Sequence, residues 1–147
     1  TEELQYYLNK WSLKMYADYP ILYLAFHGDD NVLKLQGKVI SLEELAIFLE
    51  NKCRGRVVIF GSCSTLNINK RYIKKFLKLT GALAVCGYKT DIDWIKSTLH
   101  DLLIIEAFQN NEFSLRGIDS IQAKTATIAS KFKELKFILL TQKEVMT

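Results

Sequence analysis

The sequence contains the stretch Arg56-Val57-Val58-Ile59-Phe60-Gly61-Ser62-Cys63-Ser64, in which a short apolar run ends in small residues. The length and β-branched content of the run are typical of a buried strand, and the small residues suit a turn. A second run, Tyr19-Pro20-Ile21-Leu22-Tyr23-Leu24-Ala25-Phe26, ends in the same way at His27-Gly28. Ligands of open α/β sheets bind just beyond the carboxyl ends of strands. The two runs therefore place a histidine and a cysteine where such a sheet keeps its active site.

The segment between His27 and Cys63 predicts that the two strands are parallel neighbours. Residues 32–35 alternate apolar and polar side chains, as a half-exposed strand does. Ser41-Leu42-Glu43-Glu44 is a capping-box pattern, and it opens a helix that we expect to end near Lys52, with Gly55 at its exit. A helix between two apolar strands favours a right-handed crossover and parallel pairing. His27 and Cys63 are then expected side by side at one edge of the sheet.

The rest of the chain alternates strands and helices. The first expected helix, 2–18, has an apolar stripe of Leu4, Tyr7, Leu8, Trp11 and Met15. The other expected helices are 69–80, 90–109 and 118–135, and the other expected strands are 82–86 and 136–140. This order predicts one α/β domain over residues 1–147, a three-layer sandwich with a largely parallel central sheet.

Composition narrows the class of protein. A hydrophobic content of 49% and a charged content of 24% are ordinary for a soluble globular protein, and no apolar stretch approaches a membrane helix. Three cysteines without C-x-x-C spacing and two histidines predict no metal site, and we expect no cofactor. Free thiols indicate a reducing, cytoplasmic setting. The basic residues of helix 69–80 predict a solvated face, with a nucleic-acid or acidic-partner surface as the alternative.

Cys63 and His27 form a candidate nucleophile and base. A thiolate is the reactive form of cysteine, and a strand-end turn beside an imidazole favours it. Histidine has the pKa range needed to take the thiol proton and return it to a leaving amine. Cys86 is a rival thiol, but it lies within an apolar run and is expected to be buried. Cys53 is expected to be inert or simply exposed, and His100, within a helix, is expected at the surface.

The order Leu24-Ala25-Phe26-His27-Gly28, then Ser41-Leu42-Glu43-Glu44-Leu45, then Val57 to Cys63 resembles the caspase-like cysteine peptidases. It is most similar to their bacterial CHAT branch, which includes relatives of separase. The resemblance covers roughly residues 19–95. It implies a caspase-like fold and a Cys-His dyad, with the backbone N–H groups of Gly28 and Cys63 as an oxyanion hole. It also implies a strand and a helix ahead of the His27 strand, so we expect a fragment of a longer protein or a processed chain.

Substrate preference is the point at which this sequence departs from the family. Metacaspases carry an Asp, and caspases a Gln, two residues before the nucleophile, whereas Gly61 stands here. Asp91 and Asp93 are candidate substrate-binding acids, although Thr90 with Asp93 also matches a helix cap. The side chain before the cleaved bond could be bound by an acidic pocket or by a deep apolar pocket, and both alternatives are kept here.

The sequence thus supports a cysteine endopeptidase acting on a protein or peptide substrate. The resemblance suggests an effector in bacterial defence or signalling, controlled by a sensor or regulatory domain or subunit. No membrane partner is expected, and direct nucleic-acid binding is not favoured. The alternative is a catalytically inactive caspase-like α/β protein-interaction domain. The chain has no Walker loop and no G-x-G-x-x-G motif to support nucleotide binding.

Overall fold

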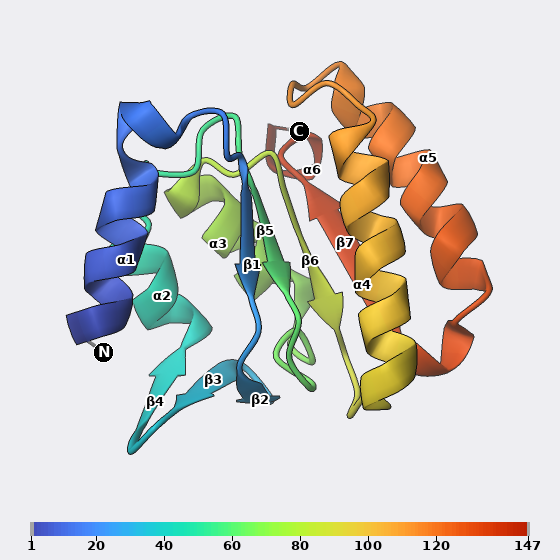
Figure 1. Ribbon diagram of the computed structural model, residues 1–147, viewed down its shortest axis with the longest axis horizontal. Coiled ribbons are helices and arrows are strands. Elements are labelled where there is room, and N and C mark those ends of the chain that lie inside the picture. Colours follow the sequence, from blue (N-terminus) through green and yellow to red (C-terminus); the bar gives the residue numbers. More distant parts are fainter. Residues whose placement is uncertain (1, 147) are drawn as a thin grey trace.

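A four-stranded sheet forms the centre of the computed structural model, which describes residues 2–146 (Figure 1). Its strands lie in the order β1 (Ile21–Leu24), β5 (Val57–Phe60), β6 (Ala84–Tyr88) and β7 (Phe137–Thr141). The first three strands are parallel, and β7 runs antiparallel to β6. The expected α/β class and the largely parallel sheet are therefore confirmed.

Helices cover both faces of this sheet because its central strands are apolar on both sides. Val58, Phe60 and Val85 belong to the core beneath α2 (Leu42–Phe48) and α3 (Lys70–Thr80). Alternate residues of the same strands pack beneath α4 (Trp94–Gln109) and α5 (Gly117–Ser130). Figure 1 shows α1 (Glu2–Ser12) and α2 on one side of the sheet, with α4 and α5 on the other. The helical turns η1 (Lys14–Tyr16) and η2 (Lys133–Leu135) and the short α6 (Lys143–Met146) complete the elements.

A second, antiparallel sheet follows β1 and was only partly predicted. It consists of β2 (His27–Asp29), β3 (Val32–Leu35) and β4 (Lys38–Ser41). A small hairpin containing β3, with a turn at Gly37 and Lys38, was expected, but β2 was not, because His27-Gly28 was expected to form a turn. His27 instead opens β2, because Asp29 and Val32 pair across a two-residue turn and extend the hairpin back to His27.

The local signals at helix ends are confirmed. Ser41 and Glu44 form the expected reciprocal capping box of α2, and Asp93 caps α4. Asn69, which was expected as the first residue of its helix, instead caps α3. Gly81 ends α3 in the left-handed region, at φ 74°. Helix α2 nevertheless ends at Phe48, before the predicted Lys52. The chain turns away there, so that the N–H groups of Asn51 and Cys53 can donate to the carbonyls of Leu79 and Thr80 at the end of α3.

Three other boundaries differ from expectation. Helix α1 ends at Ser12, so Met15 of the predicted stripe lies beyond it and is 74% exposed; Tyr7, within the helix, is also 57% exposed. Helix α5 ends at Ser130, and η2 follows it. Strand β6 continues through Gly87, the expected stop, because Gly87 and Tyr88 pair with Ile138 and Phe137 of β7.

Among residues 2–146, none of the helices combines the length and apolar character that crossing a bilayer requires. The same residues contain no cluster of three or more His, Cys, Asp or Glu side chains placed to hold a metal ion.

Candidate functional site

The register of the two parallel strands brings His27 and Cys63 to the same edge of the sheet. Leu24, the last residue of β1, lies beside Phe60, the last residue of β5. The N–H of Gly61 continues the pairing with a 3.0 Å hydrogen bond to the carbonyl of Leu24. His27 lies three residues after Leu24, and Cys63 lies three residues after Phe60. Their predicted placement beyond adjacent, parallel strands is confirmed.

Gly28 holds the histidine segment tightly against the cysteine loop. A Cβ atom at Gly28 would lie 2.4 Å from both the carbonyl oxygen of Cys63 and Oγ1 of Thr65, and 2.9 Å from Cβ of Ser62. Real side chains do not pack this closely, so only glycine lets β2 approach the loop. Gly28 is therefore required by a close approach, and not by a turn.

The backbone N–H groups of Gly28 and Cys63 are both left without a hydrogen-bond partner in the described part of the chain. Asp29 and Val32 close the hairpin, so the alternation of an antiparallel ladder leaves the Gly28–Leu33 pair without hydrogen bonds. The N–H of Gly28 thus points away from β3. Within residues 2–146, neither this N–H nor that of Cys63 has a hydrogen-bond acceptor. Two unpaired donors beside a thiol suit the binding of a developing oxyanion.

The loop that carries Cys63 is fixed on several sides. Ser64 adopts φ 50°, in the left-handed region, and its N–H donates to the carbonyl of Thr90 at 3.0 Å. Oγ of Ser62 lies 2.7 Å from Oγ1 of Thr65, which also lies 3.2 Å from the carbonyl of Val32. The backbone around Cys63 is thereby held against both β3 and the segment after β6.

Asp91 and Asp93 make structural hydrogen bonds and do not line the pocket beside Cys63. Oδ1 of Asp91 accepts from the Ser64 hydroxyl at 3.1 Å, which helps to hold the loop. Oδ1 of Asp93 accepts from the N–H of Lys96 at 2.9 Å and caps α4. The helix-cap interpretation of Asp93 is confirmed.

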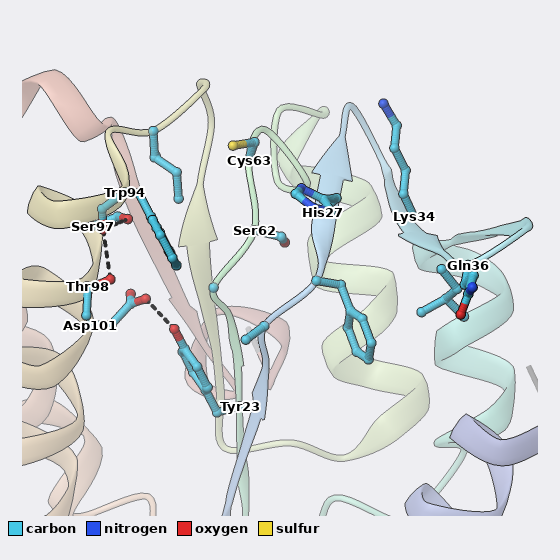
Figure 2. Close-up of a pocket in the computed structure, with 15 residues that line it drawn as sticks. Tyr23, His27, Lys34, Gln36, Ser62, Cys63, Trp94, Ser97, Thr98 and Asp101 are labelled. Carbon is cyan, nitrogen blue, oxygen red and sulfur yellow. Dashed lines mark hydrogen bonds between the residues drawn. The ribbon is translucent and has the colours of Figure 1, made fainter.

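His27, Gly61 and Cys63 line an open pocket of about 780 Å³. Figure 2 shows it between α4 and the ends of β1 and β5, with Trp94, Ser97, Thr98 and Asp101 on the α4 wall. Tyr23 lies directly over Gly61: a Cβ at Gly61 would be 2.4 Å from the tyrosine oxygen. The absence of a side chain at position 61 is thus explained by Tyr23, which takes that space.

Cys63 is the accessible thiol. Cys53 and Cys86 are buried, and Cys63 is partly exposed within the pocket. Burial raises the pKa of Cys53 to about 12 and raises that of Cys86 well above its ordinary value. The burial of Cys86 was predicted correctly, and Cys53 is inert because it is enclosed. His27 and Cys63 lie on the same rim, but the sulfur points away from the ring, toward α4 (Figure 2).

A buried polar network behind the pocket was missed from the sequence. The hydroxyls of Tyr23 and Tyr88 donate to the two carboxylate oxygens of Asp101, and Nδ1 of His100 lies 2.9 Å from the Tyr88 oxygen. The surface placement of His100 was wrong, since its side chain is fully buried. Leu99 and Leu102 misled the prediction, because they are exposed. A helical period of three or four residues places Asp101, His100 and Ser97 on the same face as the buried Ile104 and Phe108. This periodicity could have revealed that they are buried.

We expect His100 to stay neutral in the folded protein to unusually low pH. Tyr88 gives its proton to Asp101, so Nδ1 of His100 must be the donor to Tyr88, and Nε2 is a buried atom without a partner among residues 2–146. Protonation would bury an unpaired charge, and burial lowers the pKa from 6.5 to about 4.

The depressed pKa makes stability depend on pH. The folded state binds fewer protons than the unfolded state, so the stabilisation is complete above pH 6.5 and is lost as pH falls toward 4. The difference corresponds to about 3 kcal/mol. NMR titration of the two imidazoles should show one midpoint far below 6.5 that disappears in His100→Gln. A midpoint near 6.5 for His100 would contradict this account.

The fold and the site together define an α/β protein with a cysteine and a histidine at the carboxyl edge of a mostly parallel sheet. The chain belongs to a family of unknown function, DUF6642, whose model matches residues 1–141. No curated protein matches the sequence.

Proposed function

We propose that this protein is a caspase-like cysteine endopeptidase in which Cys63 is the nucleophile and His27 the general base. The observation that carries the proposal is the shared pocket. His27 and Cys63, at matching positions beyond paired strands, line it, and the nearby N–H groups of Gly28 and Cys63 have no acceptor among residues 2–146. A buried structural cysteine would need neither the histidine nor the free donors.

The reaction follows from these groups. His27 takes the proton of the Cys63 thiol, and the sulfur attacks the peptide carbonyl carbon. The π electrons move to the oxygen, which the N–H groups of Gly28 and Cys63 bind. When the C–N bond breaks, the imidazolium gives its proton to the leaving amine and a thioester remains. Water, deprotonated by His27, then attacks the thioester, and the sulfur leaves and recovers the proton.

The chemistry requires one side-chain movement. The Cys63 sulfur points toward α4 (Figure 2), and within residues 2–146 it makes no hydrogen bond with His27. Rotation about the Cα–Cβ bond of Cys63 moves the sulfur without moving the fixed loop. Catalytic contacts commonly tighten only when substrate binds.

The surroundings of His27 favour the second candidate, a catalytically inactive caspase-like interaction domain. His27 is exposed, and among the described residues no side chain orients its ring by a hydrogen bond. In such a protein the pocket would bind a peptide without cleaving it.

Thiol reactivity separates the two candidates. A peptide acyloxymethyl ketone places an electrophilic carbon where a scissile carbonyl would lie, so an active site should direct it to Cys63. We expect mass spectrometry to find Cys63 labelled at least about 100-fold faster than Cys53 or Cys86, and His27→Ala to slow Cys63 labelling by about 10²–10⁴-fold. Iodoacetamide, which has no peptide to guide it, is the matched reagent for simple accessibility. Equal labelling in wild type and His27→Ala would contradict the peptidase and support the interaction domain.

A peptide library then identifies the cleaved bond. Cleavage by the wild type and none by Cys63→Ala would attribute the activity to this site.

A further inference from the structure

The pocket beside Cys63 has a carboxylate in its wall that the proposed reaction does not use. Asp101 comes from the second turn of α4 and is only 5% exposed, yet it lines the pocket together with Tyr23 and Gly61. Figure 2 shows its side chain pointing from α4 toward Tyr23, across the floor below Trp94 and Ser97. A peptide bound at Cys63 would direct a side chain into this space.

Asp101 has hydrogen-bond donors but no positive partner among the described residues. Tyr23 donates to Oδ2 at 2.6 Å, and Tyr88 donates to Oδ1. The ion pairs found among residues 2–146 involve other acids: Asp29, Glu43, Asp119 and Glu134. A carboxylate accepts about four hydrogen bonds, so these two tyrosines leave room for further donors.

The surroundings explain why a cation is the missing partner. A buried acid is normally paired, because removing a charge from water is costly. Burial raises the pKa of Asp101, while the two tyrosine hydroxyls oppose that change by stabilising the anion. A guanidinium or ammonium group would supply the remaining donors and neutralise the charge.

The pocket walls also suit a long basic side chain. Trp94, Phe26 and Ala25 offer apolar surface for the carbon stem of arginine or lysine, and the Trp94 ring can stack on a guanidinium. Gly61 has no side chain because Tyr23 takes that space, and from there Tyr23 donates a hydrogen bond to Asp101, which lines the same pocket as Cys63.

We propose that Asp101 determines specificity by binding an arginine or lysine side chain immediately before the cleaved bond. The inference rests on the proposed peptidase function for the position of that bond. It assigns recognition to an acid on α4, in place of the residue two positions before the nucleophile.

Binding is measured separately from cleavage by using Cys63→Ala. Two acetylated tripeptide amides that differ only in a final arginine or citrulline are titrated against it, with the fluorescence change of Trp94 as readout. Citrulline has the shape of arginine without the charge. We expect arginine to bind about 10- to 100-fold more tightly, as hydrogen bonds to charged groups contribute.

Variants then test the role of Asp101. In the Cys63→Ala background, Asp101→Asn should abolish the difference between arginine and citrulline. Asp93→Asn, on the same helix, removes one negative charge and keeps a capping residue, so it should preserve the difference.

Each result decides the matter. Equal binding of the two peptides overturns the proposal even if Asp101→Asn does not fold, because that comparison needs no change at Asp101. A preference that survives Asp101→Asn overturns the assignment to this residue. If binding depends on Asp101 but the wild type cleaves neither arginine nor lysine peptides, the peptidase proposal is refuted. The binding of a cation at Asp101 is then supported on its own.

Discussion

If the proposed peptidase function holds, replacing Cys63 by alanine should lower peptide cleavage by at least about 10³-fold, and it should change the free energy of unfolding by about 1 kcal/mol or less. We expect activity to fall because no other accessible thiol of residues 2–146 lines the pocket. Stability is kept because the side chain is partly exposed and its sulfur makes no hydrogen bond within the described part of the chain. Peptide cleavage and urea denaturation measure the two effects.

Cys86→Ala is the matched control, since the same atoms are removed from the interior of β6. Cys86 is fully buried, so this variant should lose stability while keeping its activity. Full cleavage by Cys63→Ala, or unfolding of that variant, would overturn the assignment of Cys63 as nucleophile.

Replacing Gly28 by alanine should damage both the fold and the site. The new methyl group would overlap the carbonyl of Cys63 and Oγ1 of Thr65, so either β2 or the fixed loop must move. Overpacking of this kind costs about 1–3 kcal/mol. The movement would also separate His27 from Cys63, so we expect His27-dependent labelling of Cys63 by the peptide ketone to fall by at least about 10-fold.

Gly55→Ala controls for a loss of stability alone. Gly55 lies at φ 71°, and a Cβ added there would have no other atom within 4 Å. Alanine at this position therefore strains the backbone by about 1–2 kcal/mol without touching the site. We expect this variant to be less stable, with Cys63 labelling unchanged below its unfolding transition. If Gly28→Ala keeps both stability and labelling, the close approach of β2 to the cysteine loop is not needed.

The positions of His27 and Cys63 were predictable because they depend on local sequence patterns and on one topological rule. Val57 to Phe60 and Ile21 to Leu24 have the composition of buried strands, and the helix between them requires parallel pairing. The capping residues Ser41 and Asp93 were equally readable, since a cap involves only residues within one turn.

The wall that α4 contributes to the pocket was not predictable from such patterns. Asp101 and His100 look like the polar face of a helix whose neighbours Leu99 and Leu102 are apolar, yet the exposed and buried sides are the reverse. Tyr23 and Tyr88 determine which face of α4 is buried, because their hydroxyls need acceptors and Asp101 of α4 supplies them. Partners 78 and 13 residues apart leave no local mark in the sequence.

The sequence by itself determined the α/β class, the parallel neighbours β1 and β5, and the position of His27 and Cys63 at one edge, since strand composition and crossover handedness are properties of short segments. Only the tertiary structure decided that His27 opens a second sheet, that Gly28 is required by contact with the Cys63 loop, and that Asp101 faces the pocket. Those features arise where segments distant in the chain pack together, and the space and hydrogen-bond partners there are set by the whole fold.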